Sequence, residues 1–593
     1  MSVDASAVAR VVGIDTKFED LRAGSVLFLP QRVAVFAQGE SAVSYSQDKV
    51  QITSAKQVGD GYGYNSEAYM VFRELFPSNG DGIGTIPATF YPLVDNSGSA
   101  AAAGDVAPSG SATTAAAFRI RIGGVLSGEF VIPVGVVDVT AGCISISDAV
   151  LATLGMPVKT LFTYGAVTAT PDGGNTGDGT VTALSASGEP TPGVYSLICN
   201  TAVAEGGEFT LIDPNGVTIS TSLVMDIGSG NSTIFVVGGL TFTITDGVAD
   251  FIIGDSFDIE APATNVAFTA GWKAATTNDI EIEVIGPSVG VSFAITVMVG
   301  GLVNPSITTA LAQVGGIWET MFLNCGRFDD TVILDEFNTF GEGRWGQLLR
   351  KPMMSFVGCT KLTPATATVV SSTRTADRVN VQLNTPGSPN MPCVVAARLL
   401  ARIAKVANNN PPKDYGSQRA TGIIPGKDGE QWDYPQRDQV VKAGASTIEV
   451  KDSIVNIADT VTMYAPIGEV PPAYRYAVDI VKLMQVIFNI DLIFANEEWD
   501  GAPLIPDNQA TTNPAARKPK DAKAQVASVV DALGLAAIIS DPETAKESIT
   551  ANIDPGNPKR LNVTVTVQLS GNVGIISVDL KFGFFFGTAD IIG

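Results

Sequence analysis

The chain has 593 residues, of which 45% are hydrophobic and 16% charged, and this indicates a globular protein of about three or four domains. The net charge of −23 argues against free nucleic acid as a partner, because phosphate contacts require concentrated Lys and Arg. No histidine is present, which excludes a Ser-His-Asp triad, a Cys-His pair and a His-ligated metal site.

The cysteines and the apolar runs predict where the chain folds. Five cysteines stand far apart and no CxxC motif occurs, which favours buried free thiols in a reducing compartment. The opening MSVDASAVARVVG has no apolar signal-peptide region, and no run approaches the ~18 apolar residues that a membrane helix needs. We therefore expect a protein that is made and folded in a cytoplasm, without membrane insertion.

The N-terminal part predicts an arm followed by the start of a buried core. Residues 1–22 form a short arm that can be extended. Residues 24–39 contain VLFLPQRVAVFAQG, which is typical of a strand in a buried sheet. Residues 65–76 carry apolar side chains on one helical stripe, and Pro77 ends this predicted helix.

The character of the sequence changes after Gly80. Residues 95–117 consist mostly of small residues, which predicts a flexible loop. The next stretch, FRIRIGGVLSGEFVIPVGVVDV, predicts hairpins, and residues 147–154 predict a short helix. Turn signals then recur at short intervals through residues 166–262, with strands between them, so this stretch predicts a compact sandwich or barrel.

Helix and strand patterns alternate in the rest of the chain. Strands are expected at NDIEIEVIG and SFAITVMVGG, before residue 306. Helical candidates follow, among them PCVVAARLLARIAKVA and AYRYAVDIVKLMQVIFNIDLIF. The predicted fold class is therefore α+β and multidomain, with a mixed α/β core that is interrupted by β-rich material between about residues 91 and 305.

Two apolar segments near the C-terminus predict exposed strands. Residues 561–569 read LNVTVTVQL, residues 574–587 read GIISVDLKFGFFFG, and the SGN between them signals a turn, so the two form a hairpin or two linked strands. The second strand alternates and ends in an aromatic tip, with Ile576, Val578, Leu580, Phe582 and Phe584 as its apolar residues. Such an edge templates pairing with another chain, so we expect it to be shared with a neighbouring copy.

Four basic residues stand close together in this acidic chain, and we call them the basic cluster: Arg517, Lys518, Lys520 and Lys523. They precede and open residues 521–533, whose apolar residues follow helical spacing. Positive charge at a helix N-terminus opposes the helix dipole, which points to an acidic partner surface. A merely solvated basic face is the alternative and explains the pattern equally well.

Three further patterns favour ordinary explanations. Asp-containing turns within residues 166–262 suggest calcium, but no EF-hand is present and β-turns account for them. The GIIPGKD at residues 422–428 is one residue short of a phosphate loop. Three acidic pairs could serve acid/base chemistry, although solvated pairs near element ends are commoner. These pairs are Asp329-Asp330, Asp335-Glu336 and Glu497-Glu498.

The order of the segments resembles the tail sheath proteins of contractile-tailed bacteriophages. The arm followed by LPQRVAVFAQG is similar to the family's opening, and SEAYMVFRELFP is similar to the next element. VGGLVNPSITTALAQVGG, GRFDDTVI and GEGRWGQLL follow the family's central core. AYRYAVDI, AQVASVVDALGL, NPKRLNVTVTV and the terminal strand follow its C-terminal signature. The match covers most of the chain and is poor over residues 411–435.

A second resemblance concerns residues 166–262, which look like a β-module of phage capsid-decoration and tail proteins, with PGVYSLIC and GGEFTLIDPNG among the matching stretches. Together the two resemblances imply five parts. They are residues 1–22 as an N-terminal exchange arm, residues 23–90 with 306–560 as a sheath core, residues 91–165 with 263–305 as an inserted β-rich middle domain, residues 166–262 as an outermost β-sandwich or barrel module, and residues 561–593 as C-terminal exchange strands.

The resemblance implies a structural role without catalysis, cofactor or metal. Copies would stack as hexameric rings in a six-start helix around the tail tube, and contraction would drive the tube through the host cell envelope for genome delivery. The implied partners are further sheath subunits, the tail tube protein, and the baseplate and tail terminator proteins. The implied location is the virion, after assembly in the host bacterial cytoplasm.

The resemblance also assigns roles to residues. The implied strand-exchange residues are Val11, Val12 and Ile14 of the N-terminal arm, with Ile576, Val578, Leu580, Phe582 and Phe584 of the C-terminal strand. The basic cluster is the implied tube contact. Three alternatives stay open: the sheath of a phage-derived, pyocin-like injection device, a glycan- or receptor-binding virion protein, and a hydrolase that uses carboxylates.

Overall fold

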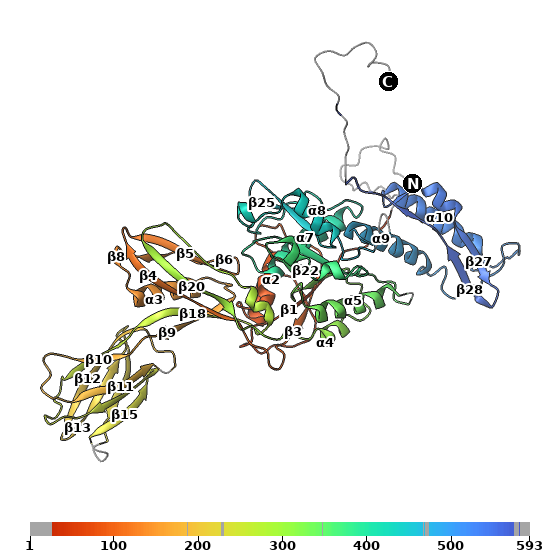
Figure 1. Ribbon diagram of the computed structural model, residues 1–593. Helices are drawn as coiled ribbons and strands as arrows, with labels where there is room; N and C mark the ends of the chain where they lie inside the picture. The colour runs from red at the N-terminus through yellow and green to blue at the C-terminus, as the bar shows by residue number, and fades with distance from the viewer. Residues whose placement is uncertain are drawn as a thin grey trace, which may run out of the picture. The chain divides into compact units, whose positions relative to one another are not determined.

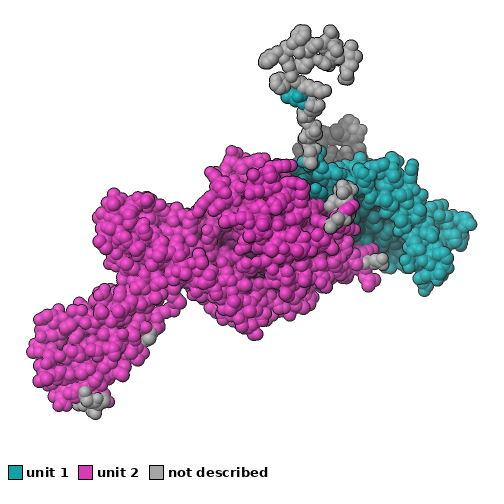
Figure 2. Space-filling model, in the orientation of Figure 1, with its two compact units in different colours: residues 1–30, 406–415, 476–593 teal, residues 31–405, 416–475 magenta. Residues whose placement is uncertain are grey.

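A computed structural model describes residues 26–186, 188–226, 231–346, 348–466, 468, 474–574 and 580. The chain divides into two compact units, which Figure 2 colours separately. Unit 1 comprises residues 1–30, 406–415 and 476–593, and unit 2 comprises residues 31–405 and 416–475. The predicted exchange residues Val11, Val12, Ile14, Ile576, Val578, Phe582 and Phe584 lie outside the described residues.

A six-stranded sheet with the order β2-β3-β1-β21-β22-β23 lies in unit 2 (Figure 1). Its strands are β1 (Val33–Gln38), β2 (Val50–Ile52), β3 (Ala88–Leu93), β21 (Met321–Asn324), β22 (Met354–Cys359) and β23 (Asn380–Asn384). All neighbouring pairs are parallel except β2 with β3. The five parallel strands are buried along their whole length, as a sheet covered on both faces requires. The strand predicted within residues 24–39 is therefore confirmed as β1.

The remaining elements associated with this sheet are mostly helices. They are α1 (Ala55–Tyr62), α2 (Glu67–Leu75), α4 (Thr308–Ala312), α5 (Thr331–Trp345), α6 (Pro364–Ala367), α7 (Pro392–Asn409) and α8 (Tyr434–Lys442), with the 3-10 turns η2 (Ser371–Thr373) and η3 (Asp428–Glu430) and the hairpin β24 (Thr447–Lys451) and β25 (Ile454–Asp459). Helix α2 confirms the helix predicted over residues 65–76. It begins where the Ser66 side chain accepts a hydrogen bond from Tyr69 N at 3.0 Å, and it ends before Pro77.

The flexible loop predicted over residues 95–117 is wrong. The stretch forms β4 (Ala103–Ala112) and the start of β5 (Ala116–Ile122). Strand β4 lies between β18 (Ala263–Ala270) and β20 (Val291–Val299). A Cβ added at Gly104 would lie 2.6 Å from the Thr296 carbonyl oxygen, and one at Gly110 would lie 2.4 Å from the Gly290 carbonyl oxygen. The small residues therefore permit close strand approach rather than flexibility.

The other elements around β4 are short strands and one helix. They are β6 (Val125–Leu126), β7 (Phe130–Ile132), β8 (Gly135–Val136), α3 (Val139–Leu151), β9 (Val158–Tyr164), the 3-10 turn η1 (Ala275–Asp279) and β19 (Ile282–Ile285). The predicted hairpins are confirmed, because β5 pairs antiparallel with β6 and with β7. Helix α3 begins earlier than predicted, since the Asp138 side chain accepts a hydrogen bond from Ala141 N at 3.0 Å and starts the helix there.

Every regular element described between Thr168 and Ala261 is a strand. The strands are β10 (Thr168–Pro171), β11 (Thr180–Ala186), β12 (Gly193–Val203), β13 (Gly206–Ile212), β14 (Thr218–Val224), β15 (Ser232–Val237), β16 (Leu240–Thr245) and β17 (Ser256–Ala261). They form a sheet with the order β10-β17-β12-β13-β14 and another with the order β11-β16-β15. Tyr195, Phe209 and Phe242 lie in one core shared by both sheets. At one Asp-containing turn, Asp213 Oδ1 accepts from Val217 N at 2.7 Å, as an ordinary turn does.

Unit 1 contains three helices and two small sheets among its described residues. They are α9 (Ala477–Phe494), α10 (Pro519–Leu535), α11 (Pro542–Glu547), the pair β26 (Ile539–Ser540) with β29 (Gln568–Leu569), and the pair β27 (Thr550–Asp554) with β28 (Asn557–Thr564). Val486 of α9, together with Val526 and Leu533 of α10, belongs to its apolar core. The chain is thus a mixed α+β protein of more than one compact unit, as the sequence predicts.

Candidate assembly interface

The basic cluster lies at the start of α10, and the structure divides its four residues into two pairs. Lys520 and Lys523 are exposed in the first two turns of the helix. Side chains three positions apart on a helix are neighbours on its surface, so these two present their charges together. They are the members of the cluster that a partner surface can reach.

The other pair makes contacts inside unit 1. Arg517 Nη1 donates to the Pro514 carbonyl oxygen at 3.0 Å, and its Nη2 lies 3.6 Å from Oε2 of Glu498. Lys518 Nζ donates to the Gln509 carbonyl oxygen at 2.7 Å. These contacts hold the loop that precedes α10. Substitution of either residue would change the local fold together with the surface charge.

Two carboxylates offset the positive charge at the α10 N-terminus. Asp521 Oδ2 accepts a hydrogen bond from Lys518 N, and Asp507 Oδ1 accepts one from Lys520 N, each at 2.9 Å. Both acids lie where the helix dipole favours negative charge. The sequence argument for an acidic partner rested on an uncompensated charge at this helix end. Asp521 and Asp507 balance this positive charge within the chain, so the helix end gives little reason to expect an acidic partner. Contact with a tube stays a prediction.

The apolar face of α10 confirms the helical spacing predicted over residues 521–533. Val526, Val530 and Leu533 are buried, and Val529 packs beside them partly buried. They pack in the same cluster as apolar side chains of α9 and of β28. The helix therefore stabilises unit 1 through one face and presents Lys520 and Lys523 outside that face.

The strand predicted over residues 561–569 is found in two pieces, and the predicted second strand over residues 574–587 lies mostly outside the described residues. Its first part belongs to β28, which pairs antiparallel with β27, and its last two residues form β29, which pairs with β26. Asp554 Oδ1 accepts hydrogen bonds from Gly556 N at 2.8 Å and Asn557 N at 3.1 Å, which forms the β27–β28 turn. The sequence signal for this hairpin was the DPGN between two alternating segments.

The hairpin of β27 and β28 is a sheet of only two strands within the described part of the chain. Residues 557–560 of β28 are exposed. Such a pair presents unpaired backbone groups on both outer edges and gains little stability alone. Leu580, the one predicted C-terminal exchange residue that is described, is 78% exposed. Among the described residues no third strand covers these edges, and strand exchange stays a prediction.

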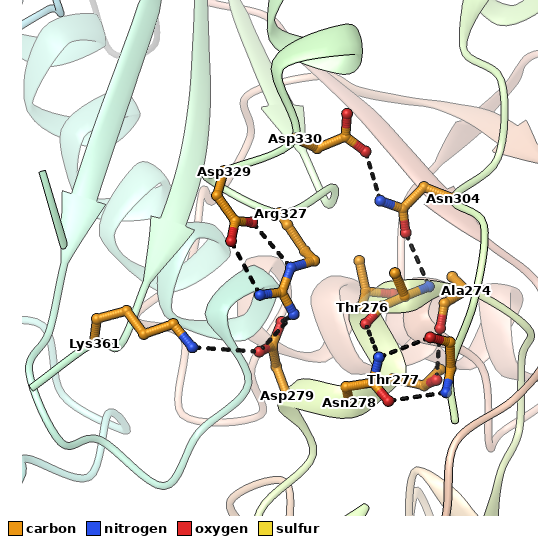
Figure 3. A network of polar contacts seen from close by, with 12 residues as sticks. Ala274, Thr276, Thr277, Asn278, Asp279, Asn304, Arg327, Asp329, Asp330 and Lys361 are labelled. Carbon is orange, nitrogen blue, oxygen red and sulfur yellow. Dashed lines mark hydrogen bonds and ion pairs between the residues drawn. The ribbon is translucent and has the colours of Figure 1, made fainter. Parts of the chain in front are cut away.

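The acidic pair Asp329-Asp330 belongs to a polar network rather than to an acid/base centre (Figure 3). Arg327 Nη1 donates to both carboxylate oxygens of Asp279, at 2.9 and 2.8 Å, and Arg327 Nε donates to Asp329 Oδ1 at 2.9 Å. Burial raises the pKa of Asp329, but the hydrogen bonds and charge of Arg327 outweigh burial and hold that pKa below its usual value. Asp330 caps α5 by accepting from Ile333 N at 3.2 Å.

A cavity beside this network is too small for a substrate. Its volume is about 20 Å³, room for a single water, and its lining includes Glu67, Asp279, Arg327 and Cys393. Glu67 is buried at the start of α2, and its Oε2 accepts from Gln38 N at 3.0 Å. Burial raises the pKa of Glu67 to about 8, opposed by this hydrogen bond. A carboxyl buried beside so small a cavity fits a structural role.

The described residues bear on metal binding, membrane insertion and disulfide formation. No group of three or more Cys, Asp or Glu side chains there is arranged to hold a metal ion. None of the described helices has the length and apolar character needed to cross a bilayer. All five cysteines are buried and free, as predicted, and burial raises the pKa of Cys359 to about 12.

Comparison with known proteins gives a match among phage tail proteins. The tail sheath protein of the Mu-like prophage FluMu from Haemophilus influenzae is 24% identical over 374 residues, which cover 60% of this chain and 74% of that protein. This chain is similar to a phage tail sheath protein. The resemblance read from the order of the sequence segments is thereby confirmed. No protein-family model matches the chain.

Solved structures of sheath proteins also align with the chain. A sheath tail protein from Listeria innocua is 11% identical, with 93% of each chain covered and a TM-score of 0.41. One from Desulfitobacterium hafniense is 11% identical, with 94% of this chain and all of that chain covered and a TM-score of 0.39. The sheath complex of an extracellular contractile injection system in its contracted state is 12% identical, with 45% of this chain and 71% of that chain covered and a TM-score of 0.31.

Proposed function

We propose that this protein is the structural subunit of a contractile tail sheath and has no catalytic role. Copies stack as hexameric rings in a six-start helix around the tail tube. Contraction of this sheath drives the tube through the host cell envelope and delivers the genome. The observation that carries the proposal is the similarity to a tail sheath protein, which extends over 74% of that relative.

The unpaired edges of unit 1 support strand sharing as the means of polymerisation. Strands β27 and β28 have no third strand among the described residues, and the chain holds further alternating apolar residues after Gly574. A strand lent by a neighbouring copy would supply backbone hydrogen bonds to such an edge, while its alternating side chains set the register. Head-to-tail contacts form a ring where the rotation closes and an open helix where it does not, so contacts of this kind can build rings and stack them helically.

The proposed partners follow from the same role. Sheath subunits contact the tail tube, the baseplate and the tail terminator, and the assembly is part of the virion after it forms in the host bacterial cytoplasm. The stored energy lies in an extended lattice that is metastable relative to the contracted one, so no nucleotide or cofactor is consumed. Residues 166–262 are an outward-facing module in this proposal, separate from the polymerising parts.

Electron microscopy of the purified full chain tests the central claim. Negatively stained samples at rising protein concentration should contain tubes with a regular striation. Deletion of residues 574–593 should leave soluble, folded subunits that form no tubes. The matched control is deletion of residues 166–262, which should leave tube formation intact. Discrete particles at every concentration, or tubes that persist without residues 574–593, would contradict the proposal.

The proposed tube contact has its own test, restricted to the two exposed members of the basic cluster. The double substitution Lys520→Glu and Lys523→Glu should abolish extended sheath on tail tubes, because exposed charge pairs are weak singly and act together. It should leave sheath self-association in the absence of tubes unchanged. Lys56→Glu with Lys442→Glu, two exposed lysines of unit 2, is the control. Extended tails of normal length in the double variant would defeat the assignment.

A further inference from the structure

Lys482 is a fully buried lysine in the first turns of α9. Its side chain is 0% exposed, and the apolar residues Val481 and Met484 beside it in α9 are also buried. An ammonium ion is costly to bury unless its charge is balanced and its three N–H groups have acceptors. The residues that balance the charge of Lys482 and accept its hydrogen bonds therefore indicate its structural role.

Three acceptors surround the Lys482 ammonium group. Its Nζ donates to Asp479 Oδ1 at 3.0 Å, one turn earlier in α9. It also donates to the Ser570 carbonyl oxygen and to Asn572 Oδ1, each at 2.5 Å. One carboxylate balances the charge, and the number of acceptors equals the number of ammonium hydrogens. Two of the three acceptors come from the chain just after β29, a segment that we call the arm root (residues 570–572).

Other contacts hold the arm root from different sides. Ser570 N donates to the Ile538 carbonyl oxygen at 3.1 Å. Asn572 Nδ2 donates to the Pro412 carbonyl oxygen at 2.8 Å. Immediately beyond the root, the Val573 side chain is 80% exposed. The arm root is thus held by α9, by the turn before β26 and by residues 406–415.

We propose that Lys482 is a positioning residue for strand sharing, which fixes the arm root so that residues 574–593 start from one defined point on each subunit. The inference rests on the proposed function and deepens it. A segment whose starting point is fixed loses less conformational entropy when a neighbouring copy captures it, so its effective concentration at the neighbour's edge is higher.

The chemistry of a buried lysine supports this role over simple core packing. An apolar side chain in the same place would avoid the cost of burying charge and would pack at least as well. The ammonium group differs because its hydrogen bonds are complete only when the arm root is in place. Displacement of the root would leave Lys482 with Asp479 alone, a costly state that holds the root to α9.

Two substitutions separate positioning from folding. Asn572→Ala removes one acceptor from Lys482 and the donor to Pro412 at an exposed position, so the fold should be unaffected. Lys482→Met removes the ammonium group itself. Asn572→Asp keeps the acceptor for Lys482 but loses the donor to Pro412, so it isolates the Lys482 contact. Lys56→Met, at an exposed lysine of unit 2, controls for loss of one positive charge.

The measurements are the protein concentration at which tubes first form and the fluorescence anisotropy of a dye placed at the root. Because the five native cysteines are buried, a dye can be attached selectively to Gly574→Cys. Asn572→Ala and Lys482→Met should raise the threshold concentration about tenfold, as expected for lost charge-assisted hydrogen bonds. Both should lower the anisotropy of the unassembled subunit, and Asn572→Asp should restore both values toward those of the parent chain.

The outcomes distinguish this proposal from the proposed function. If deletion of residues 574–593 abolishes tubes but Asn572→Ala leaves threshold and anisotropy unchanged, the positioning role is overturned and strand sharing stands. If the truncated chain forms tubes normally, strand sharing fails and the positioning role fails with it. A threshold change in Lys482→Met that merely follows a lower melting temperature, with no change in Asn572→Ala, also overturns the role.

Discussion

The six-stranded sheet of unit 2 and the β27–β28 hairpin of unit 1 place their strands in opposite environments. The parallel strands β1, β3, β21, β22 and β23 are buried along their whole length. In contrast, β28 has no fully buried residue, and its first four residues are exposed. The sheet is stabilised by side chains of its own subunit, whereas the hairpin has no third strand among the described residues.

This difference separates what a single subunit must do from what the proposed sheath must do. A sheath subunit has to fold alone before it polymerises, so a fully covered sheet is needed in the free chain. Its contacts with neighbours must form later and must survive large rearrangement, which suits incomplete strands at the end of the chain. Changes in the sheet should therefore alter folding of the free subunit, and changes in the hairpin should alter assembly.

The largest effect is expected from Phe36→Ala in β1. Phe36 is buried and stacks on Tyr91, with ring centroids 4.9 Å apart, and it also contacts Phe322 and Phe337. Removing its ring should lower the free energy of unfolding of unit 2 by about 3–5 kcal/mol. Urea unfolding of the free subunit measures the change, with Phe36→Leu as the milder control. A loss below about 1 kcal/mol would mean that this core is not what stabilises the sheet.

A pH dependence of nearly the same size is expected from Glu67, at the start of α2. Burial raises its pKa from 4.5 to about 8, so the folded protein keeps this proton over a range in which the unfolded chain releases it. The stabilising contribution is complete below pH 4.5 and is lost as pH rises toward 8. The slope should reach up to about 1.4 kcal/mol per pH unit.

Glu67→Gln removes that titration and keeps the acceptor for Gln38 N. Urea unfolding of the free subunit between pH 5 and 8 should therefore show a flatter decline for the variant than for the parent chain. Glu129→Gln, at an exposed glutamate of the same unit, is the control and should leave the decline unchanged. Parallel declines in the parent chain and Glu67→Gln would show that another group carries the pH dependence.

The sequence predicts the central sheet better than the C-terminal hairpin, and the reason lies in the residues. The run VAVFAQ is apolar at nearly every position, so a buried strand is its only stable form. In the C-terminal part, β28 reads NPKRLNVT and has few apolar residues. The apolar pattern of residues 574–587 is stronger than the DPGN turn signal, so the sequence draws attention to the later segment. In β4 the sequence predicts a loop where the structure has a strand, because the Gly and Ala that allow close strand approach also occur in flexible loops.

The candidate interface is predictable from the sequence only where it depends on local patterns. The basic cluster and the α10 spacing are visible in the sequence, since both are local patterns. The engagement of Arg517 and Lys518 inside unit 1 depends on loop residues around Gln509 and Pro514 that no periodicity places. Lys482 has a sequence signal, because the mostly apolar run VDIVKLMQV holds it three residues after Asp479. Its two partners in the arm root lie 88 and 90 residues away along the chain.

A smaller loss than that of Phe36→Ala is expected from Arg327→Ala, which opens the network in Figure 3. Arg327 balances the charges of both Asp279 and Asp329. Asp279 is mostly buried, and removal of Arg327 takes away its closest cation. Because these side chains are partly exposed, water can compensate in part, and we expect a loss of about 2 kcal/mol. Arg119→Ala, which breaks an exposed pair with Glu129, is the control and should cost less than about 1 kcal/mol.

The smallest effect on the free subunit is expected from Val563→Ala in β28. Val563 lies opposite Ala551 of β27 and packs, partly buried, against the apolar cluster of unit 1. Truncation should lower the free energy of unfolding of the free subunit by about 1 kcal/mol or less, because the site is half-exposed and can adjust. If a neighbouring strand covers this hairpin in the sheath, the same truncation should destabilise assembled tubes by more than it destabilises the free chain.

Two measurements compare the assembled and free states. Light scattering reports the temperature at which tubes dissociate, and the free state is represented by the melting temperature of the truncated subunit that lacks residues 574–593. For each substitution, the destabilisation of tubes is divided by the destabilisation of the free subunit. This ratio should exceed one for Val563→Ala and should stay near one for Phe36→Leu. A ratio near one for Val563→Ala would place β28 outside the contacts between subunits. The contrast between a sheet covered within the subunit and a hairpin covered by a neighbour would then no longer hold.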